Sequence, residues 1–259
     1  MSTDHDPGPP PQVVEIFERL PGYGEHAALF WHDWGPVFYR GRLDGSARLL
    51  VIASDPGPTE RIAGRSLVGN AGQRVQGFLT KLGLTRSYVC LNAYAYATLP
   101  SRADEAAREI LRAPEHTRWR NELFDAVTGP GLQAVVAFGA QARDALARWE
   151  GAPDVPVHKV PHPSSRDPEA LLDAWRDAVG DLRGVVTPDP DGDPTVPTYG
   201  ATFAEGDYAP IPRGDLPYGM PDWFGDDAWI RALGENGSVR RPRSDALHTI
   251  EWRAPGGAE

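Results

Sequence analysis

Four short apolar runs constrain the fold of this chain more than any other feature of its sequence. They lie at residues 47–54, 87–96, 132–139 and 155–163. Segments with helical spacing follow or separate them, at residues 70–84, 101–113, 117–129, 140–149 and 167–183. Nearly continuous apolar runs are typical of strands buried on both faces, as in parallel sheets that helices cover. The sequence therefore predicts a three-layer α/β/α sandwich around a four-stranded parallel sheet.

The two ends of the chain depart from this alternation. Residues 1–12 are polar and rich in proline and predict a disordered tail. A single domain is expected over residues 13–183, with a core at 47–183. Residues 28–45 are aromatic and broken by Gly and Pro, which fits either a short strand pair or a loop packed on the core.

Residues 184–259 are dense in Pro, Gly, Asp and aromatic side chains and show little periodicity. We expect this segment to be an irregular acidic extension that packs on the core by burying its aromatic side chains. A partly disordered tail is the alternative.

The net charge of −10 is unevenly distributed along the chain. Residues 1–47 carry 3 basic and 7 acidic side chains, residues 48–183 carry 17 and 16, and residues 184–259 carry 6 and 13, which gives −4, +1 and −7. The near-neutral middle segment allows an enzyme that grips DNA through a few local contacts, but argues against a strongly salt-dependent, sequence-blind binder. The acidic extension could dock a protein partner or obstruct DNA.

Composition limits the class of protein further. Cys90 is the only cysteine, which rules out an internal disulfide, a four-cysteine zinc site and a cysteine-ligated iron–sulfur cluster. No apolar run approaches the roughly 18 residues needed to span a bilayer, and the N-terminus lacks the basic and apolar regions of a signal peptide. We expect a cytoplasmic monomer that binds no metal, cofactor or membrane.

Polar side chains follow three of the four predicted strands. Asp55 ends the first, Asn92 ends the second, and His162, Ser164 and Ser165 follow the fourth. Parallel strands present their carboxyl ends at one edge, where ligands bind, so these groups should share a cleft. There a carboxylate could orient water, an amide could bind the polar edge of a flat ligand, and an imidazole could donate to a developing anion. Each motif alone is more often a turn or cap, so the hypothesis depends on their joint placement.

A glycine-rich stretch, "GRSLVGNAG" at 64–72, precedes the helix expected at 70–84. Its backbone N–H groups could meet a phosphate or a base oxygen. It contains neither the Gly-Lys-Ser/Thr of a Walker loop nor a GxGxxG fingerprint, which disfavours a nucleotide triphosphatase or a dinucleotide enzyme.

The chain contains four motifs in this order: "DPG" (55–57), "GRSLVGNAG" (64–72), "LNAYAY" (91–96) and "HPSS" (162–165). Their order and spacing resemble those of the uracil-DNA glycosylase superfamily, over roughly residues 47–183. The resemblance implies the fold of that superfamily, DNA as partner, and hydrolysis of the N-glycosidic bond of a flipped base. It implies that Asp55 activates water, that Asn92 binds the base, and that His162 stabilises the leaving anion.

The resemblance also bears on neighbouring positions. Ser54 stands where the iron–sulfur glycosylases with "GEAPG" carry their acid, and Gly57 stands where the "GQDPYH" glycosylases carry a tyrosine that bars thymine. Leu67 replaces the phenylalanine that stacks on the flipped base in "GRPFVG". The base contacts expected by resemblance are therefore Ser54, Gly57, Gly64, Leu67 and Asn92. The expected DNA contacts are Arg65, Ser164, Ser165 and Arg166, the last where relatives often place a wedge.

The leading prediction is a monofunctional glycosylase for uracil in DNA. Because Gly57 and Leu67 alter the pocket, a glycosylase for another deaminated or modified base is an alternative. A non-catalytic DNA- or partner-binding relative is a second alternative, which the acidic, aromatic ends favour. A hydrolase of free nucleosides or nucleotides is a third, and it would show little salt dependence.

Overall fold

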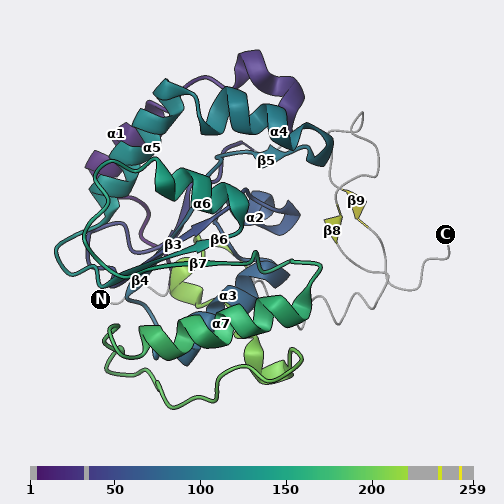
Figure 1. Ribbon diagram of the computed structural model, residues 1–259. Coiled ribbons are helices and arrows are strands. Elements are labelled where there is room, and N and C mark those ends of the chain that lie inside the picture. The colour runs from purple at the N-terminus through teal and green to yellow at the C-terminus, as the bar shows by residue number, and fades with distance from the viewer. Residues whose placement is uncertain (1–4, 32–34, 221–238, 241–250, 253–259) are drawn as a thin grey trace.

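A five-stranded sheet forms the centre of the computed structural model, which describes residues 5–31, 35–220, 239–240 and 251–252 (Figure 1). The strands, in spatial order, are β2 (Tyr39–Gly41), β4 (Tyr88–Asn92), β3 (Leu49–Ala53), β6 (Ala134–Phe138) and β7 (Val157–Val160). The last four are parallel, which confirms the predicted four-stranded parallel sheet. Strand β2 adds an antiparallel fifth strand at the edge beside β4.

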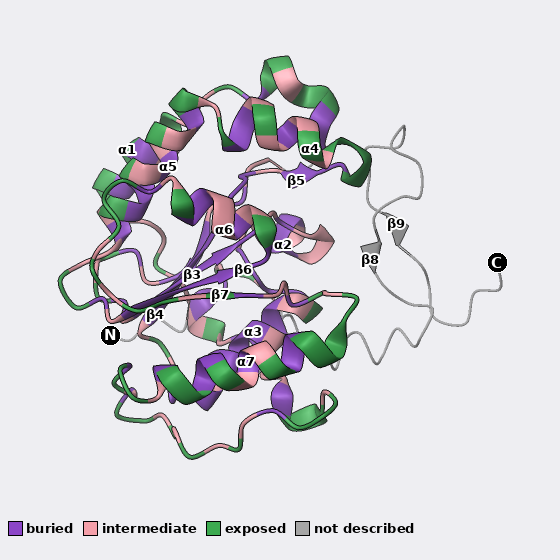
Figure 2. Ribbon diagram, in the orientation of Figure 1, coloured by how far each residue is buried: buried purple, intermediate pink, exposed green. Residues whose placement is uncertain are grey.

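Helices cover both faces of the sheet and complete the three-layer sandwich (Figures 1 and 2). One face carries α1 (Pro11–Glu18), α4 (Ala103–Ala106), α5 (Pro114–Val127) and α6 (Ala140–Ala147), and the other carries α3 (Asn70–Lys81) and α7 (Pro168–Leu182). Successive side chains of a strand point to opposite faces. Leu50 and Ile52 of β3 therefore belong to the first core, and Leu49 and Val51 belong to the second. Burial on both faces explains why the strands read as apolar runs.

The connections hold several short elements. Residues 28–45 do form two short strands, but β1 (Phe30–Trp31) pairs with β5 (Ala97–Thr98), whereas β2 pairs with β4. Helix α2 (Pro58–Ala63) directly follows the first turn after β3. The remaining elements are η1 (Gly24–Leu29), η2 (Pro100–Arg102), the π-helical η3 (Ala107–Leu111), η4 (Glu205–Asp207), η5 (Arg213–Asp215), β8 (Val239–Arg240) and β9 (Glu251–Trp252). The single helix expected at 101–113 is thus divided into η2, α4 and η3.

The N-terminal segment is attached to the core from Asp6 onward. The Asp6 carboxylate accepts a hydrogen bond from the Tyr39 hydroxyl at 2.7 Å and pairs with Arg65 Nε at 2.6 Å, and its backbone N–H donates to the Leu216 carbonyl at 3.0 Å. The prediction of a disordered tail over residues 1–12 is therefore wrong for residues 6–12, since tertiary partners hold a segment whose local composition suggests disorder. Residues 1–4 lie outside the described residues.

The described part of the extension, residues 184–220, lies against α3, α7 and β2, and its helical elements are the short η4 and η5. Its aromatic side chains meet the core at Trp175, whose ring lies 5.6 Å from that of the buried Tyr199. Three of its acids pair with buried or half-buried cations of the core: Asp189 with Arg48 at 3.3 Å, Asp207 with Lys81 at 2.9 Å, and Asp215 with Arg40 at 3.0 Å. Apart from β8 and β9, residues 221–259 of the predicted extension lie outside the described residues.

Candidate active site

A cleft of about 460 Å³ lies at the carboxyl ends of the parallel strands. The chain passes from β3 to β4 on one side and then crosses to β6 on the other side of β3, so connections diverge at the carboxyl end of β3, where ligands bind in such folds. The cleft brings together five of the predicted site residues, Asp55, Gly57, Leu67, His162 and Ser164. Its other lining residues are Ala53, Pro58, Thr59, Glu60, Gly69, Asn70 and Ala71.

Asp55 follows β3 at the wall of the cleft and is half-buried. Its Oδ2 accepts a hydrogen bond from the backbone N–H of Thr98 at 2.8 Å. Thr98 is itself fixed by pairing with Phe30 in the small β1–β5 sheet. Burial, and then the nearby Asp55 carboxylate, raise the pKa of Tyr94 well above its ordinary value. The carboxylate is thus oriented by a strand, and a protonated phenol lies close to it.

His162 lies in the loop after β7. Its Nδ1 accepts a hydrogen bond from the backbone N–H of Ser164 at 3.1 Å. In the neutral imidazole the proton is therefore assigned to Nε2, which becomes a donor. Gly139, after β6, has φ of +92°, and a Cβ there would lie 3.1 Å from the His162 Cβ. A glycine at that position lets the imidazole pack directly against the end of the sheet.

Glu60 is a buried carboxylate in the cleft wall that sequence reasoning missed. Its Oε1 accepts the backbone N–H groups of Val68 at 2.9 Å and Gly69 at 2.8 Å. Its Oε2 would lie 2.5 Å from a Cβ at Gly57, so Glu60 occupies the space that a side chain at position 57 would need. The sequence signal that could have located Glu60 is "GPTE" (57–60). A Gly before Pro and an acid in the first turn are typical of the start of a helix.

Leu67 has a φ of +54°, and among the described residues it is the only non-glycine residue with a positive φ. A branched residue in this region is strained by about 1–3 kcal/mol and persists where the surroundings hold it, often at functional sites. Here the neighbouring loop amides are held by Glu60, and Gly72 lets the first turn of α3 approach, since a Cβ there would overlap the Leu67 carbonyl. The Leu67 side chain is buried and supplies an apolar wall without an aromatic ring.

Asn92, Ser54 and Gly64 do not line the cleft directly. Asn92 ends β4 and pairs in register with Ala53, which does line it. Its Nδ2 is buried and makes no hydrogen bond within the described part of the chain. An unsatisfied buried donor costs about 1–3 kcal/mol, so a ligand acceptor that reached this amide would gain affinity. Ser54 is buried, and Gly64 ends α2 with a φ of +62°.

The four residues predicted to contact DNA fall in different places. Ser164 is exposed at the cleft, Ser165 donates its N–H to the His162 carbonyl at 2.8 Å, and Arg166 is exposed next to them. Arg65 instead pairs with Asp6, and its guanidinium carbon lies 4.7 Å from the ring centre of Tyr39. The structure therefore brings Ser164 to the cleft, with Ser165 and Arg166 next to it in the chain, whereas Arg65 does not line the cleft.

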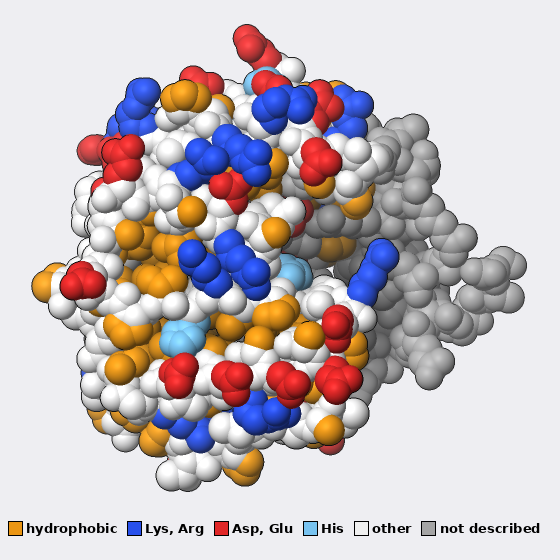
Figure 3. Space-filling view, viewed as in Figure 1, with side chains coloured by type: hydrophobic (Ala, Val, Ile, Leu, Met, Phe, Trp, Pro, Cys, Tyr) orange, Lys and Arg blue, Asp and Glu red, His pale blue; other side chains and the backbone are white. Residues whose placement is uncertain are grey.

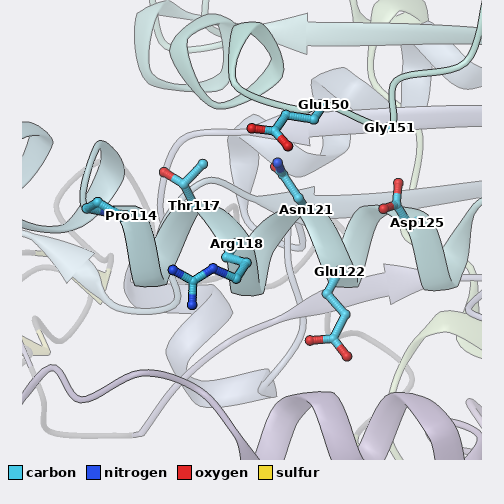
Figure 4. Close-up of a pocket in the computed structure, with 8 residues that line it drawn as sticks. All are labelled: Pro114, Thr117, Arg118, Asn121, Glu122, Asp125, Glu150 and Gly151. Carbon is cyan, nitrogen blue, oxygen red and sulfur yellow. The ribbon is translucent and has the colours of Figure 1, made fainter.

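A larger hollow, of about 690 Å³, lies along α5 and the turn after α6 (Figure 4). Two of its three acidic groups have partners, since Glu122 pairs with Arg19 at 2.6 Å and Asp125 accepts the Trp149 Nε1–H at 2.6 Å. None of its lining residues follows the carboxyl end of a strand. The smaller strand-end cleft is therefore the candidate active site.

The surface charge shows no continuous basic field on the face that Figure 3 presents. Basic and acidic side chains are interspersed, and a row of acidic side chains runs over α7 (Figure 3). That helix carries exposed acids at four-residue spacing, Glu169, Asp173, Asp177 and Asp181. The face in this view therefore offers no continuous positive patch to an anionic ligand.

The described residues contain no group of three or more His, Cys, Asp or Glu side chains that could hold a metal ion. A cysteine-ligated cluster, as in some glycosylases, does not fit this chain, because Cys90 is its one cysteine. Cys90 is buried in β4, with Arg40 Nη2 at 3.7 Å from its Sγ. No described helix meets the length and apolarity that crossing a membrane requires.

The fold and the cleft define an α/β/α protein with a carboxylate and an imidazole at the carboxyl ends of parallel strands. The family model described as "Uracil DNA glycosylase superfamily" matches residues 40–179, which is more than half of the chain. The chain belongs to this superfamily, and membership supports a DNA glycosylase type of activity with DNA as substrate. No curated protein matches the chain. The matched region contains Asp55 and His162, whereas the extension lies beyond it.

Proposed function

We propose that this protein is a monofunctional glycosylase that releases uracil, or a related deaminated or modified base, from DNA. One observation carries the proposal: Asp55 and His162, 107 positions apart in sequence, line one strand-end cleft. Beside its wall lies the buried Nδ2 of Asn92, which has no hydrogen-bond partner among the described residues. The cleft of about 460 Å³ is in the size range of small-ligand sites and suits a single flipped nucleotide.

The chemistry requires stabilisation of two opposite charges. As the N-glycosidic bond breaks, its electron pair leaves with the base, the sugar C1′ becomes cationic and the base becomes an anion. The Asp55 carboxylate stabilises the cation and orients a water, whose oxygen bonds to C1′ and whose proton is released for transfer to the departing base. The Nε2–H of His162 donates to a base oxygen and stabilises the anion. No lysine lines the cleft as described, so it offers no amine for a Schiff base, which favours simple hydrolysis.

The identity of the base depends on the wall formed by Gly57, Glu60 and Leu67. In the glycosylases that this chain resembles, a tyrosine stands at the position of Gly57 and excludes bases with a 5-methyl group. Here the Glu60 carboxylate occupies the space that a side chain at position 57 would need. A panel of duplex and single-stranded oligonucleotides with uracil, thymine opposite guanine, hypoxanthine or 5-hydroxymethyluracil would identify the base by its release. Uracil release with thymine excluded is the result expected.

The proposal is tested by measuring free base released from uracil-containing DNA. Asp55→Asn should lower turnover by at least about a hundredfold. His162→Ala should lower the rate while gel shifts show that much of the DNA affinity remains. Matched controls are Asp154→Asn, an exposed acid away from the cleft, and His158→Ala, a histidine within β7. Near-wild-type turnover in Asp55→Asn would contradict the assignment.

The alternatives give different results in the same assays. A non-catalytic relative would bind DNA and release no base from any member of the panel. A hydrolase of free nucleosides would release uracil from deoxyuridine, with little dependence on salt concentration, whereas a DNA enzyme loses activity as salt rises.

A further inference from the structure

His162 lies on the least supported strand of the site. Among the described strands, β7 is at the edge of the sheet and pairs with β6 alone, and three of its four residues are exposed or half-exposed. Strand β3, which ends two residues before Asp55, lies between two strands and is buried along its whole length. The sheet therefore fixes Asp55, whereas the loop that holds His162 needs contacts from elsewhere.

Two side chains hold the carbonyl groups on either side of His162. The indole Nε1–H of Trp175, in α7, donates to the Pro161 carbonyl at 3.1 Å. The Nη1–H of Arg74, in α3, donates to the Pro163 carbonyl at 2.7 Å. The backbone is thus anchored one residue before and one residue after the imidazole.

Both anchors pack against the same aromatic residue of the extension. The Arg74 guanidinium carbon lies 4.3 Å from the ring centre of Phe203, and the Trp175 ring lies 6.1 Å from that ring in an edge-to-face arrangement. Arg74 Nε also donates to the Tyr208 hydroxyl at 3.1 Å. Stacking on Phe203 and the bond to Tyr208 restrict the rotamers of a long, otherwise mobile side chain.

The extension is fastened to α3 at the same place. The backbone of Asp207 passes so close to Gly77 that a Cβ at that position would overlap the Asp207 carbonyl. The Asp207 carboxylate pairs with Lys81 at 2.9 Å, and the Ala209 N–H donates to the Gln73 carbonyl at 3.1 Å. This side of α3 is therefore built to receive residues 207–209.

We propose that residues 203–208 of the extension position His162 for catalysis, acting through Arg74 and Trp175. The inference rests on the proposed glycosylase function and adds a role for a segment outside the family match. Arg74 is a positioning residue, since its contacts are with Pro163 and the extension. A displacement of about 1 Å at a catalytic group can lower the rate about a hundredfold.

The first test compares variants of the full chain in single-turnover base release. Arg74→Gln and Phe203→Leu should each lower the rate by about 10- to 100-fold, while the Kd for DNA changes by less than about threefold. Arg176→Gln is the matched control, because Arg176 Nε and Nη2 donate to the Tyr199 and Gly200 carbonyls, both at 2.9 Å, without reaching the His162 loop. An equal loss of rate in Arg176→Gln would show that general anchoring of the extension is what matters, and would overturn the proposal.

A double variant tests whether Arg74 acts through the imidazole. In a His162→Ala background, Arg74→Gln should have no further effect on the rate, because the group it positions is absent. If Arg74→Gln lowers the rate by the same factor in the wild-type and His162→Ala proteins, the proposal is overturned. If Arg74→Gln does not fold, Tyr208→Phe replaces it, because this change removes the hydroxyl acceptor of Arg74 and keeps the ring. It should lower the rate in the wild-type background and have no further effect in the His162→Ala background.

A spectroscopic measurement separates this inference from the proposed function. Long-range ¹H–¹⁵N spectra of histidine-labelled protein report the tautomer of each imidazole, and His162→Gln identifies the signals of His162. In Phe203→Leu and Arg74→Gln these signals should move away from the Nε2–H form toward exchange between tautomers. If wild type releases no base but the signals move, the proposed function fails and the positioning stands. Unchanged signals would overturn the positioning.

Discussion

Replacing Asp215 with alanine tests whether the extension belongs to the folded core. Its Oδ2 accepts hydrogen bonds from Arg40 Nη1 at 3.0 Å and the Tyr88 hydroxyl at 2.7 Å, and its Oδ1 accepts one from Arg42 Nη2 at 3.2 Å. The side chains of Arg40 and Asp215 are fully buried. The variant therefore leaves a buried guanidinium without this counter-charge and a buried phenol without this acceptor.

The expected cost follows from that arrangement. Removing one partner of a buried ion pair destabilises a protein by about 3–5 kcal/mol, mostly because the remaining charge stays out of water. Domains are stable by only about 5–15 kcal/mol, so the loss is a large fraction of the total. At about 2–4 °C per kcal/mol for a chain of this size, Tm should fall by about 6–20 °C. Urea unfolding followed by tryptophan fluorescence, together with calorimetry, measures both quantities.

Asp191→Ala is the matched control, since it removes an acid from the same extension at the surface. The Asp191 side chain is 63% exposed and lies 4.0 Å from Arg86, so its removal should change the free energy of unfolding by about 0.5 kcal/mol or less. A loss below about 1 kcal/mol in Asp215→Ala would refute the reasoning, because it would mean that Arg40 is compensated without the extension.

Three further predictions concern the cleft and the extension. Gly139→Ala places a Cβ 3.1 Å from that of His162 at a φ of +92°, so base release in single turnover should fall about tenfold or more, while thermal melting shows a loss of about 1–3 kcal/mol. Glu60→Gln should speed hydrogen exchange at the two loop amides that Glu60 accepts, measured by NMR, because a neutral acceptor binds them less strongly. Burial favours a raised pKa for Asp189, but hydrogen bonds from a serine hydroxyl and three backbone N–H groups outweigh it and lower the pKa to about 2. Asp189 thus stabilises the fold above the unfolded-state pKa of about 4, and this contribution is lost as pH falls toward 2, so acid titration of Asp189→Asn should show a shallower loss of stability over that window.

The parallel strands and most helices could be predicted because burial leaves a local mark. Each strand is an apolar run, and α3, α5, α6 and α7 lie within two or three residues of the expected segments. Strand β2 could not be assigned in the same way, because its three residues, Tyr39–Gly41, include a buried arginine whose partners, Asp215 among them, are distant in sequence. An ion pair between residues 175 positions apart leaves no local pattern.

The catalytic candidates could be predicted from their positions after strands, and the structure brings Asp55 and His162 into one cleft. Their supports could not. Arg74 reads as one more polar residue on the outer face of α3, and only the tertiary structure shows that it holds the loop after β7. Arg65 shows the reverse error, since an arginine in a glycine-rich loop suggests a DNA contact, yet it is held by Asp6 of a segment expected to be disordered.

The charge distribution along the chain acquires a different meaning once the fold is known. The sequence alone predicts an acidic extension that could dock a protein partner or obstruct DNA, whereas in the structure three of its described acids, Asp189, Asp207 and Asp215, neutralise cations of the core. A fragment ending at residue 183 would remove the counter-charges of Lys81 and Arg40 together with the extension residues that cover them, and would uncover apolar core side chains such as Trp175. Such a fragment would therefore lose activity through misfolding, whatever the extension contributes to catalysis. Only point variants that keep the ion pairs, such as Phe203→Leu and Tyr208→Phe, can separate the two contributions.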